Sequence, residues 1–225
     1  MIPFIAFEWV WQWLAYLLSN WSFLEVLEYL GSFSVLVAVI FYFSESGNRT
    51  KQRHYQAWQV INTAQGKGGS GGRIEALQEL NADKVPLVGV DVSSAFLQGL
   101  KLEDANLLRS DFSAADVRGS DLKSSNFTSA NLRSANFRNS DLEDASFEDA
   151  DMKDVDLWGS NLSRASFRDA DLSGADLTFA DLKGVQWKEL KGVTGTNLFG
   201  VKNPPDGFLE WALKNGAVQT QAGDK

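Results

Sequence analysis

Residues 130–149 read ANLRSANFRNSDLEDASFED, and every fifth residue in this stretch is large and apolar. The same spacing holds without a break from Leu87 to Trp187. Two residues before each large residue there is usually alanine or serine, and the residue directly before it is usually Asp or Asn. The large apolar positions are Leu87, Val92, Leu97, Leu102, Leu107, Phe112, Val117, Leu122, Phe127, Leu132, Phe137, Leu142, Phe147, Met152, Leu157, Leu162, Phe167, Leu172, Leu177, Leu182 and Trp187.

A strict period of five fits neither an α-helix, with its period of about 3.6, nor a flat strand, with its period of about two. The chain must instead turn a corner once in every repeat. Short fixed repeats indicate a solenoid, in which each unit buries its apolar side chains only against the units stacked on it. We expect the small and large residues to fill a narrow core. We expect the Asp or Asn at the corners, where its side chain can bond nearby backbone groups.

The run resembles the pentapeptide-repeat proteins, whose unit reads A-(D/N)-L-X-X. Ala130-Asn131-Leu132-Arg133-Ser134 and Ala170-Asp171-Leu172-Ser173-Gly174 match this unit in full. The resemblance implies a mainly β fold, a right-handed quadrilateral β-helix with about 20 residues per coil, stacked about 4.8 Å apart. The family is defined by its shape, so the resemblance implies little about function.

The composition of the 225-residue chain argues against an enzyme and against a nucleic-acid-binding protein. There is no cysteine and only one histidine, His54, so a Ser–His nucleophile and a thiolate or histidine-rich metal site are disfavoured. The formal net charge of −8 opposes binding to phosphate backbones. A filled column also offers no cleft for catalysis. We therefore predict no catalytic residue, no metal and no cofactor.

Residues 1–46 are predicted to anchor the chain to a membrane. Residues 2–18 are apolar and rich in tryptophan, which is typical of a helix at the membrane interface. A second apolar helix over residues 22–45 is long enough to span a bilayer at a rise of about 1.5 Å per residue. The residues expected to make the anchor are Trp11, Trp21, Leu36, Ile40, Phe43, Arg49, Lys51 and Arg53.

The basic residues of this set give the expected orientation. Arg49, Lys51 and Arg53 are the first basic residues in the chain, and the positive-inside rule places them and the repeat domain in the cytoplasm. A bacterial inner membrane or a thylakoid would suit, because similar chains occur in cyanobacteria. The alternative is a buried core helix, which is disfavoured because residues 36–43 are apolar on every side. Whether residues 2–18 also cross the bilayer stays open.

The rest of the chain divides around the repeat. Residues 47–84 are predicted to form a cytoplasmic helix, a flexible glycine-rich loop and a short helix that caps the column. The loop is not predicted to bind phosphate, because it lacks the Gly-Lys-Ser/Thr sequence of a phosphate loop. Residues 85–187 are the predicted β-helix. Residues 188–225, where the period breaks, are predicted to form a second helical cap and a loose tail.

Four outward residues form the candidate interaction patch: Arg118, Arg138, Trp158 and Phe179. The residue after each large apolar one should point outward, and positions one coil apart should share a face. Arginine and aromatic residues together are typical of binding hot spots. The alternative is that the N-terminal helices or a cap cover Trp158.

These observations favour a non-enzymatic, membrane-anchored scaffold or accessory subunit that binds a protein, with a membrane protein complex as the expected partner. Membrane lipid is the second expected partner, nucleic acid is not expected, and self-association stays open. One alternative is a DNA-mimicking inhibitor of gyrase, like the quinolone-resistance members of the family. Arg118, Arg133, Arg138 and Lys153 would interrupt the negative stripe that such a mimic needs. The other alternative is a component of an oligomeric channel or transporter, for which the helices offer few polar positions.

Overall fold

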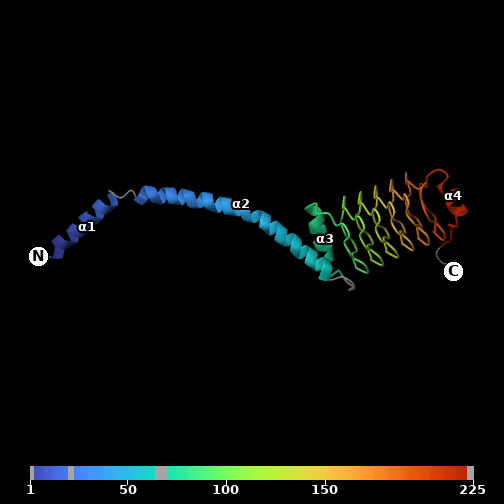
Figure 1. Cartoon of the computed structure of the whole chain (residues 1–225), viewed down its shortest axis with the longest axis horizontal. Coiled ribbons are helices and arrows are strands. Elements are labelled where there is room, and N and C mark those ends of the chain that lie inside the picture. Colours follow the sequence, from blue (N-terminus) through green and yellow to red (C-terminus); the bar gives the residue numbers. More distant parts are fainter. Residues whose placement is uncertain (1–2, 20–22, 64–69, 222–225) are drawn as a thin grey trace. The chain divides into compact units, whose positions relative to one another are not determined.

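A computed structural model describes the backbone of residues 3–19, 23–63 and 70–221. The side chains of residues 3–7, 17–18, 23–30 and 43–46 lie outside this description. The described helices are α1 (Pro3–Ser19), α2 (Phe23–Thr63), α3 (Arg73–Ala82) and α4 (Phe208–Lys214) (Figure 1). The chain divides into two compact units between Gln52 and Arg53.

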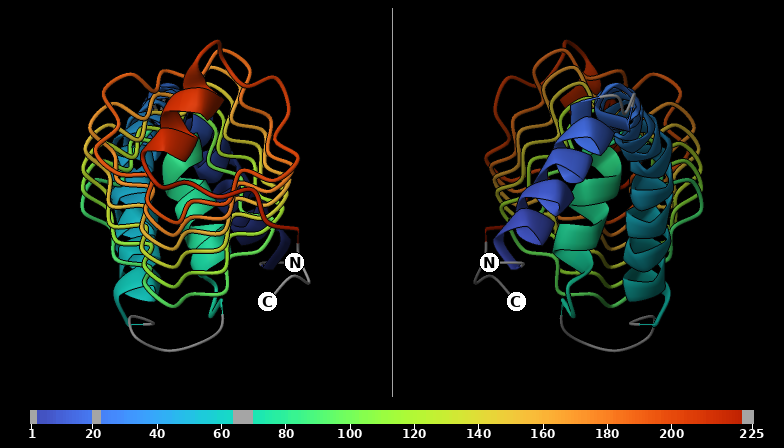
Figure 2. Two further views of the ribbon diagram at one scale, coloured as in Figure 1. Left: turned by 90° about the vertical axis from the view of Figure 1, so that its right-hand side faces the viewer. Right: turned by 90° about the vertical axis from the view of Figure 1, so that its left-hand side faces the viewer.

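The second unit is a column of stacked coils. Parallel bridges join equivalent positions of successive coils, such as Asp111 to Asn131 and Asn131 to Asp151. Each bridge is isolated, so the described residues form a stack of short paired segments rather than extended strands. Figure 2 shows the coils lying one behind the other. The pentapeptide-repeat β-helix predicted from the sequence is thus present.

A tight turn follows every large apolar residue. The N–H of Ala115 donates to the carbonyl of Phe112 at 2.9 Å, and Ala114 between them has φ of 54°. A positive φ at the third position is the signature of a type II turn. It recurs at every fifth residue from Gly89 to Gly184. The fold therefore requires the left-handed conformation at one residue in five.

The position of the Asp or Asn corrects the sequence prediction. Asp111 lies at a bridge and not at the corner, which is formed two residues later. The Asp111 Oδ1 accepts the backbone N–H of Ser113 at 2.8 Å and its hydroxyl at 2.6 Å. The expected local hydrogen bond is present, but it supports the turn from the straight segment before it.

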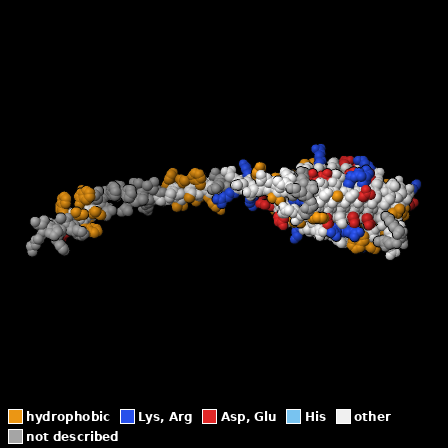
Figure 3. All heavy atoms as spheres, turned by 90° about the horizontal axis from the view of Figure 1, so that it is seen from below, with side chains coloured by type: hydrophobic (Ala, Val, Ile, Leu, Met, Phe, Trp, Pro, Cys, Tyr) orange, Lys and Arg blue, Asp and Glu red, His pale blue; other side chains and the backbone are white. Residues whose placement is uncertain are grey.

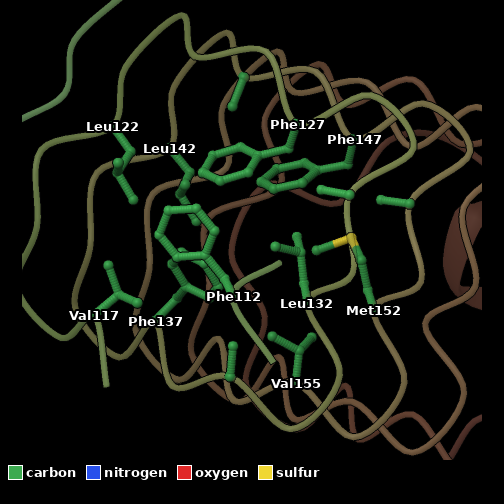
Figure 4. Close-up of a cluster of buried hydrophobic side chains, with 14 of the residues drawn as sticks. Phe112, Val117, Leu122, Phe127, Leu132, Phe137, Leu142, Phe147, Met152 and Val155 are labelled. Atoms are coloured by element: carbon green, nitrogen blue, oxygen red, sulfur yellow. The ribbon is translucent and has the colours of Figure 1, made fainter. Parts of the chain in front are cut away.

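The large apolar residues point inward as predicted. Each of them from Leu87 to Leu182 exposes 2% or less of its surface. Phe127, Phe147 and Phe167 stack with neighbouring ring centroids 5.4 Å apart and planes within 12° of parallel. Figure 4 shows the first two of these rings, Phe127 and Phe147, lying face to face in the core. Three buried serines, Ser120, Ser125 and Ser140, donate to carbonyls of the preceding coil, as Ser125 Oγ does to the Leu102 oxygen at 2.6 Å.

Helices close the first end of the column. Ala76, Leu77 and Leu80 of α3 are buried, together with Ala57 and Ile61 from the last part of α2. A hydrogen bond and an ion pair of the same unit connect these helices: His54 Nε2 lies 2.7 Å from Asp83 Oδ2, and Arg53 lies 3.5 Å from Glu79. The cap buries apolar side chains that an open first coil would expose.

The second end corrects the predicted boundary at Trp187. The coil continues to Lys202, but from Gly192 onward the bridges join residues 21 apart. A single inserted residue at Lys191 explains the shift, because it leaves the inward positions Val193 and Leu198 still buried. The five-residue period is interrupted in the sequence, but the backbone continues the coil in the structure.

Helix α4 closes this end. Phe208 and Ala212 are buried, and Trp187 packs against Phe208 at 5.5 Å and against Trp211 at 5.3 Å. A bridge from Asn197 to Val218 then pairs the segment after α4 with the last coil. The cap thus covers both the core and part of the coil edge.

The first unit exposes apolar side chains along its described parts (Figure 3). They include Trp9, Trp11, Trp13, Leu14 and Tyr16 of α1 and Phe33, Val35, Leu36, Val39, Ile40, Phe41 and Tyr42 of α2. Within the described residues, no helix is both long and apolar enough to cross a membrane. The predicted span over residues 22–45 is therefore not supported. Trp21, the side chain of Phe43 and residues 64–69 of the predicted loop lie outside the described residues.

Replacing a stacked phenylalanine should destabilise the column. Phe147→Ala removes contacts to two neighbouring rings and leaves a cavity, so we expect the free energy of unfolding to fall by about 3–5 kcal/mol. Phe147→Leu should cost less, and the exposed Ser129→Ala should stay within about 0.5 kcal/mol of the natural chain. Urea unfolding measures all three. Equal losses for Phe147→Ala and Ser129→Ala would contradict the inward stack.

Candidate interaction face

One face of the column carries the aromatic side chains that do not belong to the core. Bridges link Phe96 to Asp116, Asp116 to Asn136, Asn136 to Asp156, and so on to Asn197. The residues after the large apolar positions beside this line are Gln98, Arg118, Arg138, Trp158, Thr178 and Phe199. Phe179 directly follows the buried Thr178, and Phe96 occupies the first bridge position of the line. We define the aromatic face as Phe96, Arg118, Arg138, Trp158, Phe179 and Phe199.

The members of this face near the second end contact one another. Trp158 and Phe179 meet edge to face at 5.8 Å between centroids, and Phe179 meets Phe199 at 5.7 Å. The guanidinium carbon of Arg138 lies 5.8 Å from the centroid of the Trp158 ring. Phe179 is 39% exposed, while Trp158 is half-buried. The structure therefore brings together three of the four residues of the candidate patch.

Arg118, the fourth residue, lies one coil before Arg138 and is held by its own aspartate. Its Nε donates to Asp116 Oδ1 at 2.8 Å and its second nitrogen donates to Oδ2 at 2.7 Å. These hydrogen bonds hold the pKa of Asp116 below its usual value. Because the charge of Arg118 is paired, this face is less basic than its arginines suggest.

Two members of the face are absent from the sequence prediction. Phe96 is 54% exposed and occupies a bridge position, where the repeat normally has Asp or Asn. A phenylalanine where the repeat has Asp or Asn can be seen in the sequence alone, so Phe96 could have been included in the prediction. Phe199 lies beyond the predicted end at Trp187, so finding it requires knowledge of the inserted residue. With both included, the face runs along the whole column.

Basic residues elsewhere follow a common pattern of pairing. The residue that follows a large apolar position reaches the acid at the bridge position of the next coil. The ion pairs of this type are Lys123 to Asp141 at 3.1 Å, Arg133 to Asp151 at 3.2 Å, Arg138 to Asp156 at 2.6 Å and Lys153 to Asp171 at 3.0 Å. The stacking thus neutralises most outward cations within the column itself.

The anchor residues do not form one site. Trp11, Leu36 and Ile40 are each more than half exposed, whereas Arg53 belongs to the second unit and pairs with Glu79 and Asp83. Among the described residues, no group of three or more histidine or acidic side chains could hold a metal ion. The aromatic face is therefore the candidate site that the structure assembles.

Family models match the repeat in two parts. Residues 87–123 match the model for pentapeptide repeats in eight copies, and residues 120–194 match the model for a pentapeptide repeat region. This part of the chain belongs to the pentapeptide-repeat family. Among curated proteins there is no match.

Solved structures of the same family resemble the chain. A pentapeptide-repeat protein from the cyanobacterium Cyanothece 51142 has 20% sequence identity and a TM-score of 0.38, covering 64% of this chain and 97% of that one. One from Nostoc PCC 7120 has 28% identity and a TM-score of 0.34, covering 65% and 94%. QnrB1, a plasmid-mediated fluoroquinolone resistance protein, has 19% identity and a TM-score of 0.33, covering 60% and 76%.

The pairing of Asp116 with Arg118 predicts a specific dependence on pH. Because the folded-state pKa of Asp116 is lowered, the pair contributes stability above the unfolded-state pKa of about 3.9 and loses it as pH falls through the folded-state pKa. Asp116→Asn should therefore cost about 1 kcal/mol at neutral pH and nothing at acid pH. Denaturant unfolding across this pH range measures the difference.

The matched control is Glu103→Gln, at an exposed carboxylate with no ion pair within the described residues. Its effect on stability should be small at every pH. A loss in Asp116→Asn that persists at acid pH would show that packing, and not charge, explains it.

Proposed function

We propose that this protein is a non-enzymatic scaffold that docks a partner protein on the aromatic face. The observation that supports this most is the gathering of the four outward aromatic residues of the column on one of its faces. These are Phe96, Trp158, Phe179 and Phe199. The stability of the column does not need them there, because the core is filled from within. Aromatic side chains beside arginine are enriched where proteins bind one another.

The geometry of the face suits a protein surface. The column is rigid, since every coil is hydrogen-bonded to the coils before and after it. Trp158, Phe179 and Phe199 already contact one another, so little side-chain freedom would be lost on binding. The paired arginines at the other part of the face would form a polar rim, which interfaces commonly have.

We further propose that the N-terminal unit holds the protein on a lipid bilayer. The support is the exposed apolar surface of α1 and of residues 31–42 of α2, where side chains on all sides of the helix are exposed or nearly so. An apolar surface of this extent is unfavourable in water and indicates a binding or membrane surface. The tryptophans of α1 are typical of the membrane interface. Arg49 and Lys51 follow the apolar segment and would favour the cytoplasmic side. A column attached to a bilayer could contact a membrane protein complex, which we propose as the partner.

The alternatives receive less support. A gyrase inhibitor that imitates DNA needs a continuous negative surface, and here Arg118, Arg133, Arg138 and Lys153 lie among the acids and pair with them. The fluoroquinolone resistance of QnrB1 is a property of that protein. For a channel component, the apolar part of α2, residues 31–42, offers few polar side chains that could line a pore, namely Ser32, Ser34 and Tyr42.

Loss of the central aromatic residue should weaken the partner's binding. Trp158→Ala removes the residue that contacts both Arg138 and Phe179, so we expect about 30-fold weaker binding with unchanged folding. The tagged full-length chain is purified from native membranes, and the co-purified proteins are quantified by mass spectrometry. Thr128→Ala, one and a half coils before Trp158 and on the opposite face, is the control. An identical partner set for both variants would remove the proposal.

Membrane attachment is tested separately with lipid vesicles. The full-length protein should float with vesicles that contain anionic lipid. The double variant Leu36→Asp, Ile40→Asp should remain in the aqueous fraction, because carboxylates are costly in hydrocarbon. The control Leu36→Val, Ile40→Val should float like the natural chain. Failure of the natural chain to float, or flotation of the aspartate variant, contradicts the attachment. Resistance of the floated protein to alkaline carbonate would separate a span from an interfacial helix.

A further inference from the structure

Lys183 departs from the pairing pattern of the other outward cations. In Lys123, Arg133, Arg138 and Lys153, the side chain after the large apolar residue reaches an acid at the bridge position of the next coil. Lys183 follows the inward Leu182 and has the same place in its coil. Its partner position is the residue bridged to Asp181.

That partner position holds a second lysine. Asp181 bridges to Lys202, and the N–H of Leu182 donates to the Lys202 carbonyl at 2.9 Å. The insertion at Lys191 changes the number of this position from 201 to 202, and the residue that occupies it is a lysine and not an acid. Two cations thus stand where the earlier coils place a cation and an acid. Like charges on neighbouring positions of paired segments repel each other.

The acid between them is already engaged. Asp181 accepts the backbone N–H of Lys183 at 3.0 Å, and the amide of Asn203 donates to both of its oxygens at 3.0 and 3.1 Å. Within the described residues, neither Lys183 nor Lys202 forms an ion pair. Both side chains are exposed. The ammonium groups are therefore available to an external anion.

The lysines line a groove with an aromatic wall. Gly159 and the largely buried Ser163 are among the small residues of the groove, and Phe179 lines it beside Lys183 and Lys202. Arg164 also lines it, but its guanidinium is held by Asp144 at 2.6 Å and by Glu143. Glu143 and Asp181 line the groove as well, and Glu143 is paired with Arg164. The groove therefore offers two lysines without an ion pair, one carboxylate, Asp181, and one apolar surface.

We propose that this groove binds an acidic peptide segment, with a carboxylate between Lys183 and Lys202 and an apolar side chain against Phe179. Lys183 and Lys202 share one carboxylate, Asp181, and a carboxylate of the peptide would supply the second counter-charge. The proposal deepens the proposed function, on which it rests, because Phe179 belongs to both the groove and the aromatic face. The partner would then present an acidic segment at the second end of the column.

The test uses the full-length protein and a fluorescein-labelled oligoglutamate peptide that contains one phenylalanine. Fluorescence anisotropy should show binding that weakens as salt is added. The double variant Lys183→Ala, Lys202→Ala should bind about tenfold more weakly. The control Lys101→Ala, Lys123→Ala removes the same charge from earlier coils and should bind like the natural chain. Equal losses in both double variants, or no binding by the natural chain, would overturn the proposal.

A variant that reverses the charge at Lys202 provides a second test. Lys202→Asp restores the acid that the earlier coils have, so Lys183 should gain an internal partner. This variant should lose peptide binding while its melting temperature stays the same or rises, which a misfolded variant could not do. Unchanged peptide binding by this variant would contradict the groove.

The two proposals can fail separately. If the peptide does not bind but Trp158→Ala still loses its membrane partner, only the groove is wrong. If the peptide binds as expected but Trp158→Ala keeps every partner, the proposed function is wrong while the groove remains. A free phosphate ion that displaces the peptide at equal potency would show that the site is a general anion site and would contradict its peptide specificity.

Discussion

The structure depends on the stacking of large apolar side chains from one coil onto those of the next. Leu, Phe, Val and Met at every fifth position fill the column, and the backbone hydrogen bonds between coils keep the same register. Neither arrangement is stable alone, since a single coil could not bury its own core. The left-handed residue in each turn is the conformational cost of this packing.

This constraint also arranges the surface. Equivalent positions of successive coils become neighbours, so a residue type that recurs once per coil forms a continuous line along the column. Outward cations meet bridge-position acids in this way, and the aromatic residues gather on one face. The inserted Lys191 changes the spacing to 21 for the last coil. In this last coil Lys202 bridges to Asp181, two residues before Lys183, and Phe199 contacts Phe179.

The sequence predicts much of the fold because the inward positions repeat strictly. The core from Leu87 to Leu182 follows directly from the pattern. The pattern misplaces the corner because Asp and Asn are turn formers in general, while here they support the turn from the preceding segment. It misses the last coil because a one-residue insertion ends the period in sequence but is absorbed in space. The candidate site is predictable in part: Arg118, Arg138 and Trp158 follow from the spacing and Phe179 from its place beside Thr178, whereas Phe199 requires the register after Lys191.

The most direct test of this account is whether equivalent positions of successive coils are neighbours. The chain has no cysteine of its own, so two cysteines introduced by Lys123→Cys and Glu143→Cys meet no competing thiol. Stacked positions lie about 5 Å apart, which suits a disulfide. Under oxidising conditions this pair should form an intramolecular disulfide, detected by mass spectrometry, and the pair at Lys123 and Arg133, half a coil apart, should stay reduced. A disulfide between 123 and 133, with none between 123 and 143, would contradict the stacked coil and everything built on it.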